Sequence, residues 1–170
     1  KKYNLIGKST EKEVWNRHIL DSAQIIKYID FKKDHILSDF GSGAGLPGVI
    51  LSIANTNPNF HVKLYEKSPV KRAFLRDIQK ISKFDIQENV YDYNFIQTDY
   101  IVCRAFKKLD LIFDISREKV KNPHKLIILK GKNALNDLKK LPKDKNYRYK
   151  TVDSITDKDS KIIIATKNEK

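Results

Sequence analysis

Three glycines at alternating positions follow a short apolar run, and this feature limits most strongly how the chain can fold. Residues 36–40 are mainly apolar, which is typical of a buried strand. Gly41, Gly43 and Gly45 lack a Cβ atom, so the backbone can turn sharply and approach a ligand closely. The next segment, 47–54, begins with a proline, which the first turn of a helix tolerates. The sequence therefore predicts a strand, a glycine-rich loop and a helix in succession.

Strand-like and helix-like segments alternate to about residue 130, and two strand-like segments follow. An N-terminal amphipathic helix is predicted over residues 11–29, with Thr10 and Glu13 at capping-box spacing. Its apolar residues at helical spacing are Val14, Trp15, Ile19, Ala23 and Ile26. Further strands are predicted at 61–66, 100–103, 126–129, 147–155 and 161–167. Further helices are predicted from Ser68-Pro69, with Phe74, Leu75, Ile78 and Ile81 as the inner stripe, and at 108–120.

This order predicts one α/β domain over residues 1–170, with helices on both faces of a mostly parallel sheet. The last two strands are expected to form an antiparallel hairpin at the edge of the sheet. The lysine-rich stretch 139–150 is interpreted as a connector.

The net charge and the numbers of cysteine and methionine residues limit which functions the chain can have. A net charge of +13 indicates a polyanionic partner, with nucleic acid first and an anionic membrane second, although a lysine excess also arises from biased genome composition. The single cysteine, Cys103, excludes an internal disulfide and a cysteine-based metal cluster, and it fits a reducing cytoplasm. No signal peptide or membrane span is evident. Because the chain lacks methionine, we expect that N-terminal sequence precedes Lys1.

The spacing of the glycines indicates which class of cofactor the loop can bind. A dinucleotide fingerprint requires glycine at position 46, where the chain has Leu46, and a Walker loop requires Gly-Lys-Ser/Thr. The pattern that begins at Asp39 is Asp-x-Gly-x-Gly-x-Gly, which is typical of methyltransferases that hold S-adenosylmethionine. Glu66 ends the next predicted strand, where a carboxylate can accept hydrogen bonds from both ribose hydroxyls of an adenosine.

Five short motifs, taken together, resemble the RsmG (GidB) family. They are Arg17-His18-Ile19-Leu20-Asp21-Ser22, Asp39-Phe40-Gly41-Ser42-Gly43-Ala44-Gly45-Leu46-Pro47-Gly48, Lys71-Arg72-Ala73-Phe74-Leu75-Arg76, Arg104-Ala105-Phe106 and Leu129-Lys130-Gly131. The resemblance extends from Asn4 over nearly the whole chain. It implies a class I methyltransferase fold of seven strands and the transfer of a methyl group to N7 of a guanine in 16S ribosomal RNA. The resemblance also implies a helical segment before Asn4, which these 170 residues do not include.

The resemblance also implies roles for individual residues. Asp39, Gly41, Ser42, Gly43, Gly45, Leu46, Glu66, Val90, Tyr91 and Arg104 are the expected cofactor-binding residues. The family usually has an acid where this chain has Tyr91, so the adenine contact is expected from the backbone or from Asp92. The expected product is S-adenosylhomocysteine, and the expected partner is 16S RNA or a precursor of the small subunit, bound by a monomeric enzyme.

The reaction itself requires few catalytic side chains. N7 of guanine carries a lone pair and no proton, so no general base is expected, and placement of N7 beside the methyl group is the main task. Arg104 and Lys130 follow predicted strands and are the candidates to hold guanine O6 or a phosphate. RNA binding is expected from Lys71, Arg72, Arg76, Lys107 and Lys108, with Tyr91 and Phe106 as candidates to stack on bases.

Other interpretations remain for parts of the chain. His18, Asp21 and Ser22 lie too close together on one helix to form a hydrolase triad, and Arg17 and Asp21 are expected to pair on the helix face. No metal-ligand spacing is present. Two alternative functions stay open: a methyltransferase-like RNA-binding protein without turnover, and a dinucleotide-binding oxidoreductase, against which Leu46 counts.

Overall fold

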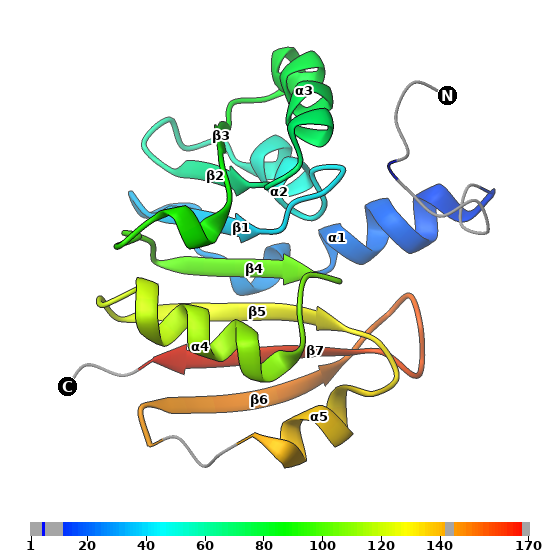
Figure 1. Cartoon of the computed structure of the whole chain (residues 1–170). Helices are drawn as coiled ribbons and strands as arrows, with labels where there is room; N and C mark the ends of the chain where they lie inside the picture. The colour runs from blue at the N-terminus through cyan, green and yellow to red at the C-terminus, as the bar shows by residue number, and fades with distance from the viewer. Residues whose placement is uncertain (1–4, 6–11, 142–144, 168–170) are drawn as a thin grey trace.

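Seven strands form one sheet in the computed structural model, which describes residues 5, 12–141 and 145–167. The strand order is β3-β2-β1-β4-β5-β7-β6 (Figure 1). The strands are β1 (Ile36–Phe40), β2 (His61–Tyr65), β3 (Asp85–Gln87), β4 (Tyr100–Arg104), β5 (His124–Lys130), β6 (Tyr147–Asp153) and β7 (Lys161–Lys167).

The sheet is parallel except at its C-terminal end, as the sequence predicts. β1 pairs in parallel with both β2 and β4, and β3 and β5 extend this parallel part on either side. β7 runs antiparallel between β5 and β6, so the predicted hairpin is confirmed. The carboxyl ends of β1, β2, β4 and β5 therefore meet at one edge of the sheet, which is where ligands bind in open α/β folds.

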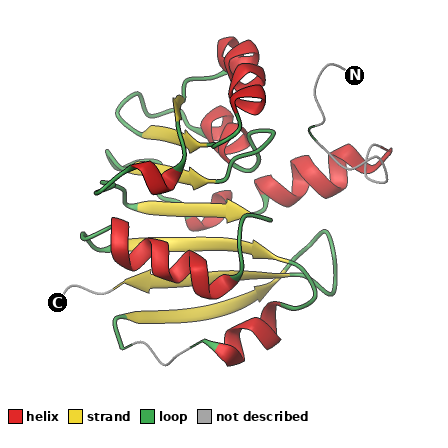
Figure 2. Cartoon of the chain, viewed as in Figure 1, coloured by secondary structure: helices red, strands yellow, loops and turns green. Residues whose placement is uncertain are grey.

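Helices cover both faces of the sheet, and each face has its own hydrophobic core. The helices are α2 (Gly48–Ala54), α3 (Pro69–Ile78), α4 (Leu109–Lys119) and α5 (Ala134–Lys140), with short turns η4 (Gln79–Ile81) and η5 (Val90–Asp92). α4 and α5 lie on one face (Figure 2) and pack on Leu126 and Ile128 of β5. α2 and α3 pack on the other face, with Ile127 and Leu129. Alternate residues of β5 thus enter opposite cores, because successive side chains of a strand point to opposite faces.

The N-terminal segment is helical but irregular, which corrects the prediction of one continuous amphipathic helix over residues 11–29. It consists of a π-helix, η2 (Trp15–Leu20), one turn of α-helix, α1 (Asp21–Ala23), and a 3₁₀ turn, η3 (Ile26–Tyr28). Trp15, expected on the inner stripe, is 79% exposed. The capping residue Thr10 lies outside the described residues.

The sequence reading also misses or misplaces smaller features. The sequence does not predict β3 or α5, and the stretch 139–150, predicted as a connector, contains the end of α5 and the start of β6. Ile81, predicted on the inner stripe of the helix after Ser68, is 62% exposed because α3 gives way to a 3₁₀ turn there. The predicted start of α3 is confirmed, with Pro69 in the first turn and Ser68 accepting a hydrogen bond from the Lys71 amide.

Candidate active site

A cleft of about 670 Å³ lies at the carboxyl ends of the parallel strands. The glycine loop after β1, the segment 103–107 at the end of β4 and the segment 128–133 at the end of β5 form its walls, and residues of the N-terminal segment and of the β6–β7 connection close one side. The predicted site residues that line it are Gly41, Ser42, Gly43, Leu46, Lys71, Arg104, Phe106, Lys107 and Lys130.

The three glycines of the loop all have positive φ angles, at 74°, 60° and 84°. A Cβ atom on Gly41 would lie 2.1 Å from the Phe106 ring, and one on Gly45 would lie 2.4 Å from Val49. A Cβ atom on Gly43 would meet only the Gly41 carbonyl oxygen, at 3.8 Å, and Gly43 lines the cleft. Gly41 and Gly45 therefore shape the loop, while Gly43 presents bare backbone to the cleft, as close approach by a cofactor requires.

Glu66 lies directly beside this loop. The Gly43 amide donates to one carboxylate oxygen at 2.8 Å, and the Ser68 amide donates to the other at 2.8 Å. The side chain is almost fully buried and is not among the residues that line the cleft. Each carboxylate oxygen keeps a second lone pair, so the carboxylate is fixed in place and still able to accept hydrogen bonds from ribose hydroxyls.

Asp39 lies beneath the loop and acts on its backbone. The Gly48 amide donates to Asp39 Oδ2 at 2.9 Å, and the Ser42 hydroxyl donates to the Asp39 carbonyl at 3.0 Å. Asp39 Oδ1 has no hydrogen-bond partner within the described part of the chain. Burial raises the pKa of Asp39 to about 7, against the opposing effect of the Gly48 and Ser42 hydrogen bonds. Asp39 is thus buried away from the cleft and contacts the loop instead, and its contribution to cofactor binding stays a prediction.

The predicted adenine contacts lie outside the lining of the cleft. Val90 is buried in the core, whereas Tyr91 is 44% exposed. The Asn89 side chain accepts a hydrogen bond from the Tyr91 amide, and the Lys107 ammonium lies 5.9 Å from the centre of the Tyr91 ring. The adenine contact stays a prediction.

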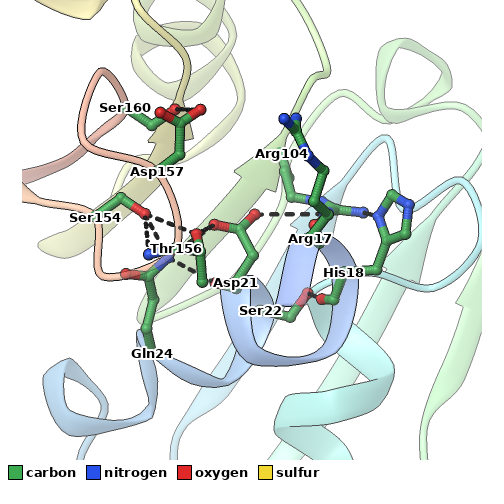
Figure 3. Close-up of polar contacts among 10 residues, drawn as sticks. All are labelled: Arg17, His18, Asp21, Ser22, Gln24, Arg104, Ser154, Thr156, Asp157 and Ser160. Atoms are coloured by element: carbon green, nitrogen blue, oxygen red, sulfur yellow. Dashed lines mark hydrogen bonds and ion pairs between the residues drawn. The ribbon is translucent and has the colours of Figure 1, made fainter. Parts of the chain in front are cut away.

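Arg104 is held at the mouth of the cleft by the N-terminal segment (Figure 3). Its Nη1 donates to the Arg17 carbonyl at 2.9 Å and lies 3.4 Å from Asp21 Oδ2, and its Nη2 lies 3.1 Å from His18 Nδ1. The pKa of His18 is lowered, first by burial and then by the Arg104 charge. A neutral His18 accepts the guanidinium hydrogen at Nδ1. The predicted Arg17–Asp21 pair is therefore wrong: Asp21 pairs with Arg104, and Arg17 pairs with Glu13 at 2.7 Å.

The residue after Arg104 changes the direction of the chain. Ala105 has a φ of 50°, in the left-handed region that non-glycine residues rarely adopt. The turn lets Arg104 reach the N-terminal segment while Phe106 covers Gly41 and packs edge-on against Phe40, with ring centroids 6.4 Å apart. Strain of this kind is concentrated at functional sites.

The predicted RNA-binding cations have different surroundings. Lys71 and Lys107 line the cleft, and Arg76 and Lys108 are exposed. Arg72 is largely buried, and its guanidinium donates to the carbonyls of Glu66 and Lys67 at 2.9 and 3.0 Å. Lys130 lines the cleft and pairs with Asp137 at 3.1 Å. The donors of Arg72 thus support the end of β2, and its contact with RNA stays a prediction.

Sequence reasoning missed several residues at this site. Lys132 and Lys161 line the cleft, and Gln24, Ser154 and Thr156 form a polar network with Asp21. No local pattern identifies this network, because Ser154 and Thr156 meet Gln24 and Asp21 across 130 and 135 positions of the chain. Among the described residues, no cluster of three histidines, cysteines or carboxylates could hold a metal ion, and none of the helices described is long and apolar enough to cross a membrane.

The fold is that of the S-adenosylmethionine-dependent methyltransferases. Such an enzyme from Aquifex aeolicus matches with a TM-score of 0.65 at 13% identity, over 94% of each chain. A putative S-adenosyl-L-methionine-dependent methyltransferase from Methanococcus maripaludis matches with a TM-score of 0.65 at 15% identity, over 100% of this chain and 96% of the other.

The sequence defines the family within this class. The family model GidB, described as rRNA small subunit methyltransferase G, matches residues 1–164. Ribosomal RNA small subunit methyltransferase G of Pelagibacter ubique is 36% identical over 176 residues, covering 99% of this chain and 82% of the relative. The protein of the same name from Rickettsia bellii is 38% identical over 165 residues, covering 96% and 83%. The chain belongs to the GidB family.

Proposed function

We propose that this chain is an enzyme that transfers a methyl group from S-adenosylmethionine to N7 of a guanine in 16S ribosomal RNA. The observation that carries the proposal is the open backbone of Gly43 at the cleft of a GidB family member, where its amide is bonded to the fixed carboxylate of Glu66. When bound, the cofactor supplies a methyl group activated by the positive charge on its sulfur. The loop from Gly41 to Leu46 would hold its amino-acid end, and Glu66 its ribose.

The ionisable groups of the cleft fit a reaction that needs no general base. Among the described lining residues, the acids are Asp21 and Asp137, and the histidine is His18. Asp21 and His18 contact Arg104, and Asp137 pairs with Lys130. These side chains are engaged in holding cations rather than exposed as proton acceptors. This suits N7, which has no proton to lose, so that orientation and exclusion of water supply the catalysis.

The charge of the cleft fits an RNA substrate better than the composition alone suggests. Seven basic residues line it against two acids, whereas the whole chain has 34 basic and 21 acidic residues. The seven are Arg17, Lys71, Arg104, Lys107, Lys130, Lys132 and Lys161. A concave surface of one charge sign attracts the phosphates of RNA. We also propose that the enzyme works as a monomer in the cytoplasm.

A methyl-transfer assay tests this function. The protein is incubated with radiolabelled S-adenosylmethionine and small-subunit particles from cells that lack the corresponding methylation, and the labelled nucleoside is identified by digestion and chromatography. We expect label in 7-methylguanosine of 16S RNA, and none with particles that already carry the modification. Label in another base would refute the N7 assignment. If the protein binds cofactor and RNA but transfers no methyl group, the inactive RNA-binding alternative is supported. If calorimetry shows that the protein binds NAD and does not bind S-adenosylmethionine, the oxidoreductase alternative is supported.

A further inference from the structure

The carboxylate of Asp21 joins three parts of the chain that are distant in sequence. Its Oδ1 accepts hydrogen bonds from the Gln24 amide and the Thr156 hydroxyl, both at 2.8 Å. Its Oδ2 lies 3.4 Å from Arg104 Nη1. Figure 3 shows Asp21 between the polar residues of the β6–β7 connection on one side and Arg104 on the other. One side chain therefore links the N-terminal segment, the end of β4 and the β6–β7 connection.

The connection between β6 and β7 is itself tied to the N-terminal segment. Gln24 donates to the Ser154 hydroxyl at 3.1 Å and accepts from the Ile155 amide at 3.0 Å. The hydroxyls of Ser154 and Thr156 lie 2.9 Å apart. These bonds hold the Thr156 hydroxyl in place. The hydroxyl in turn holds Oδ1 of Asp21, the carboxylate oxygen that faces away from Arg104.

Arg104 retains donors for a ligand. A guanidinium has five N–H groups, and three of them face the Arg17 carbonyl, Asp21 and His18. The Nε–H and one Nη2–H have no partner among the described residues. Because Arg104 lines the cleft and its side chain is only 18% exposed, the direction of these two donors depends on the groups that hold the other three.

We propose that Asp21 is a positioning residue of this enzyme. Its carboxylate, held by Gln24 and Thr156, directs the Arg104 guanidinium so that the two remaining donors face the RNA substrate, at a guanine O6 or a phosphate oxygen. Asp21 and Arg104 have equal side-chain exposure, 18%, so water screens their attraction less than that of a surface pair. The inference rests on the proposed methyl transfer, and Asp21 acts on it through Arg104.

The variant Asp21→Asn tests the proposal with little change of shape. An amide oxygen can still accept from Gln24 and Thr156, whereas the amide nitrogen would face the Arg104 donors. We expect kcat/KM for RNA to fall about 10- to 100-fold, as for a displaced positioning group. The Kd for S-adenosylhomocysteine should stay within about threefold of wild type, because the glycine loop is untouched and the proposal assigns the remaining Arg104 donors to the RNA rather than to the cofactor. Glu13→Gln, the same change in an exposed ion pair at the start of the same segment, is the matched control and should behave as wild type.

A double-mutant cycle separates positioning from general support of the fold. In an Arg104→Gln background, Asp21→Asn should cause no further loss of kcat/KM, since its effect runs through the missing guanidinium. Thr156→Val should lower kcat/KM, whereas Thr156→Ser, which keeps the hydroxyl, should restore it. A full additional loss in the Arg104→Gln background would overturn the proposal, as would wild-type activity of Asp21→Asn. If Asp21→Asn fails to fold, equal activity of the Val and Ser variants at position 156 would overturn it.

A measurement without substrate distinguishes failure of this inference from failure of the proposed function. In ¹⁵N-labelled protein, the Arg104 Nη–H signals, assigned by their loss in Arg104→Gln, should be resolved in the wild type because rotation is restricted. They should broaden in Asp21→Asn and stay resolved in Glu13→Gln. Unchanged signals in Asp21→Asn would overturn the positioning role even if methyl transfer is confirmed. If the signals broaden in Asp21→Asn but the wild type transfers no methyl group, the positioning of Arg104 by Asp21 stands and the proposed function is refuted.

Discussion

The Gly43 amide donates a 2.8 Å hydrogen bond to the Glu66 carboxylate, across 23 positions of sequence. The two features that indicate nucleoside binding are thus in direct contact with each other. A shift of either would displace the other, so the glycine loop and Glu66 form one unit.

Glu66→Gln should weaken cofactor binding by about tenfold or more, because an amide can accept at only one of its two ends while both the Gly43 and Ser68 amides donate to position 66. Calorimetry with S-adenosylhomocysteine measures the loss. Glu118→Gln, which changes an exposed acid paired with Lys119, should leave the affinity unchanged. Wild-type affinity of Glu66→Gln would remove Glu66 from the binding site.

Gly43→Ala and Gly41→Ala should differ in their effects on stability. At Gly43 the added Cβ has room, so only the positive φ costs about 1–2 kcal/mol, and the main effect should be loss of S-adenosylhomocysteine binding. At Gly41 the same strain is joined by overlap with the Phe106 ring at 2.1 Å, so the free energy of unfolding should fall further. Denaturant unfolding and calorimetry on both variants check this. Full cofactor binding by Gly43→Ala would mean that the cofactor does not approach this glycine.

Asp39→Asn should stabilise the protein most at high pH. Burial raises the pKa of Asp39 from 3.8 to about 7, so the folded state disfavours the charged form. The folded wild type should therefore lose stability relative to Asp39→Asn as the pH rises from about 4 to about 7. Urea unfolding at several pH values measures the difference, with the exposed Asp85→Asn as control. A difference independent of pH would show that Asp39 does not titrate in this range.

His124→Gln should reveal the opposite trend. His124 Nδ1–H donates to the Asn122 carbonyl at 2.7 Å, and Nε2 lies 2.6 Å from the Ser116 hydroxyl, which also contacts Tyr147. Burial lowers the pKa of His124 from 6.5 to about 4. The contribution of the neutral His124 ring to the free energy of unfolding is fully present above pH 6.5. It is lost as the pH falls toward 4, by at most about 1.4 kcal/mol per pH unit.

The advantage of the wild type over His124→Gln should therefore shrink through this range, which urea unfolding at each pH measures. The control is His61→Gln, a change at an exposed histidine. Because Asp39 and His124 act in opposite directions over nearly the same pH range, each must be compared with its own variant. A constant advantage from pH 7 to pH 4 would contradict the neutral, buried state of His124.

Local patterns in the sequence were sufficient for the glycine loop, Glu66 and most of the strands. The loop and the acid each follow a buried strand, and parallel strands bring their carboxyl ends together, so the meeting of Gly43 and Glu66 could be expected. β3, with three residues, is too short for its alternation to be recognised. The apolar spacing at Trp15 suggested a buried stripe, but spacing does not reveal whether a partner surface lies opposite.

The polar contacts of the site could not be predicted in the same way. Spacing on a helix suggested that Arg17 would pair with Asp21, yet the partner of Asp21 is Arg104, 83 positions away. Arg72 looked like a surface cation in the sequence, whereas its guanidinium binds the carbonyls at the end of β2. Such pairs depend on which side chains the fold brings together, and a one-dimensional pattern carries no information on that.

The place of β7 between β5 and β6 has a consequence for synthesis on the ribosome. β7 is the last of the described strands to be made, yet it occupies an interior position of the sheet. Until it emerges, β5 has an open hydrogen-bonding edge, and β6 has no neighbouring strand to pair with. Neither of the last two strands can join the sheet before β7 is made, so the nascent chain must wait for residues 161–167 before it can become a finished enzyme.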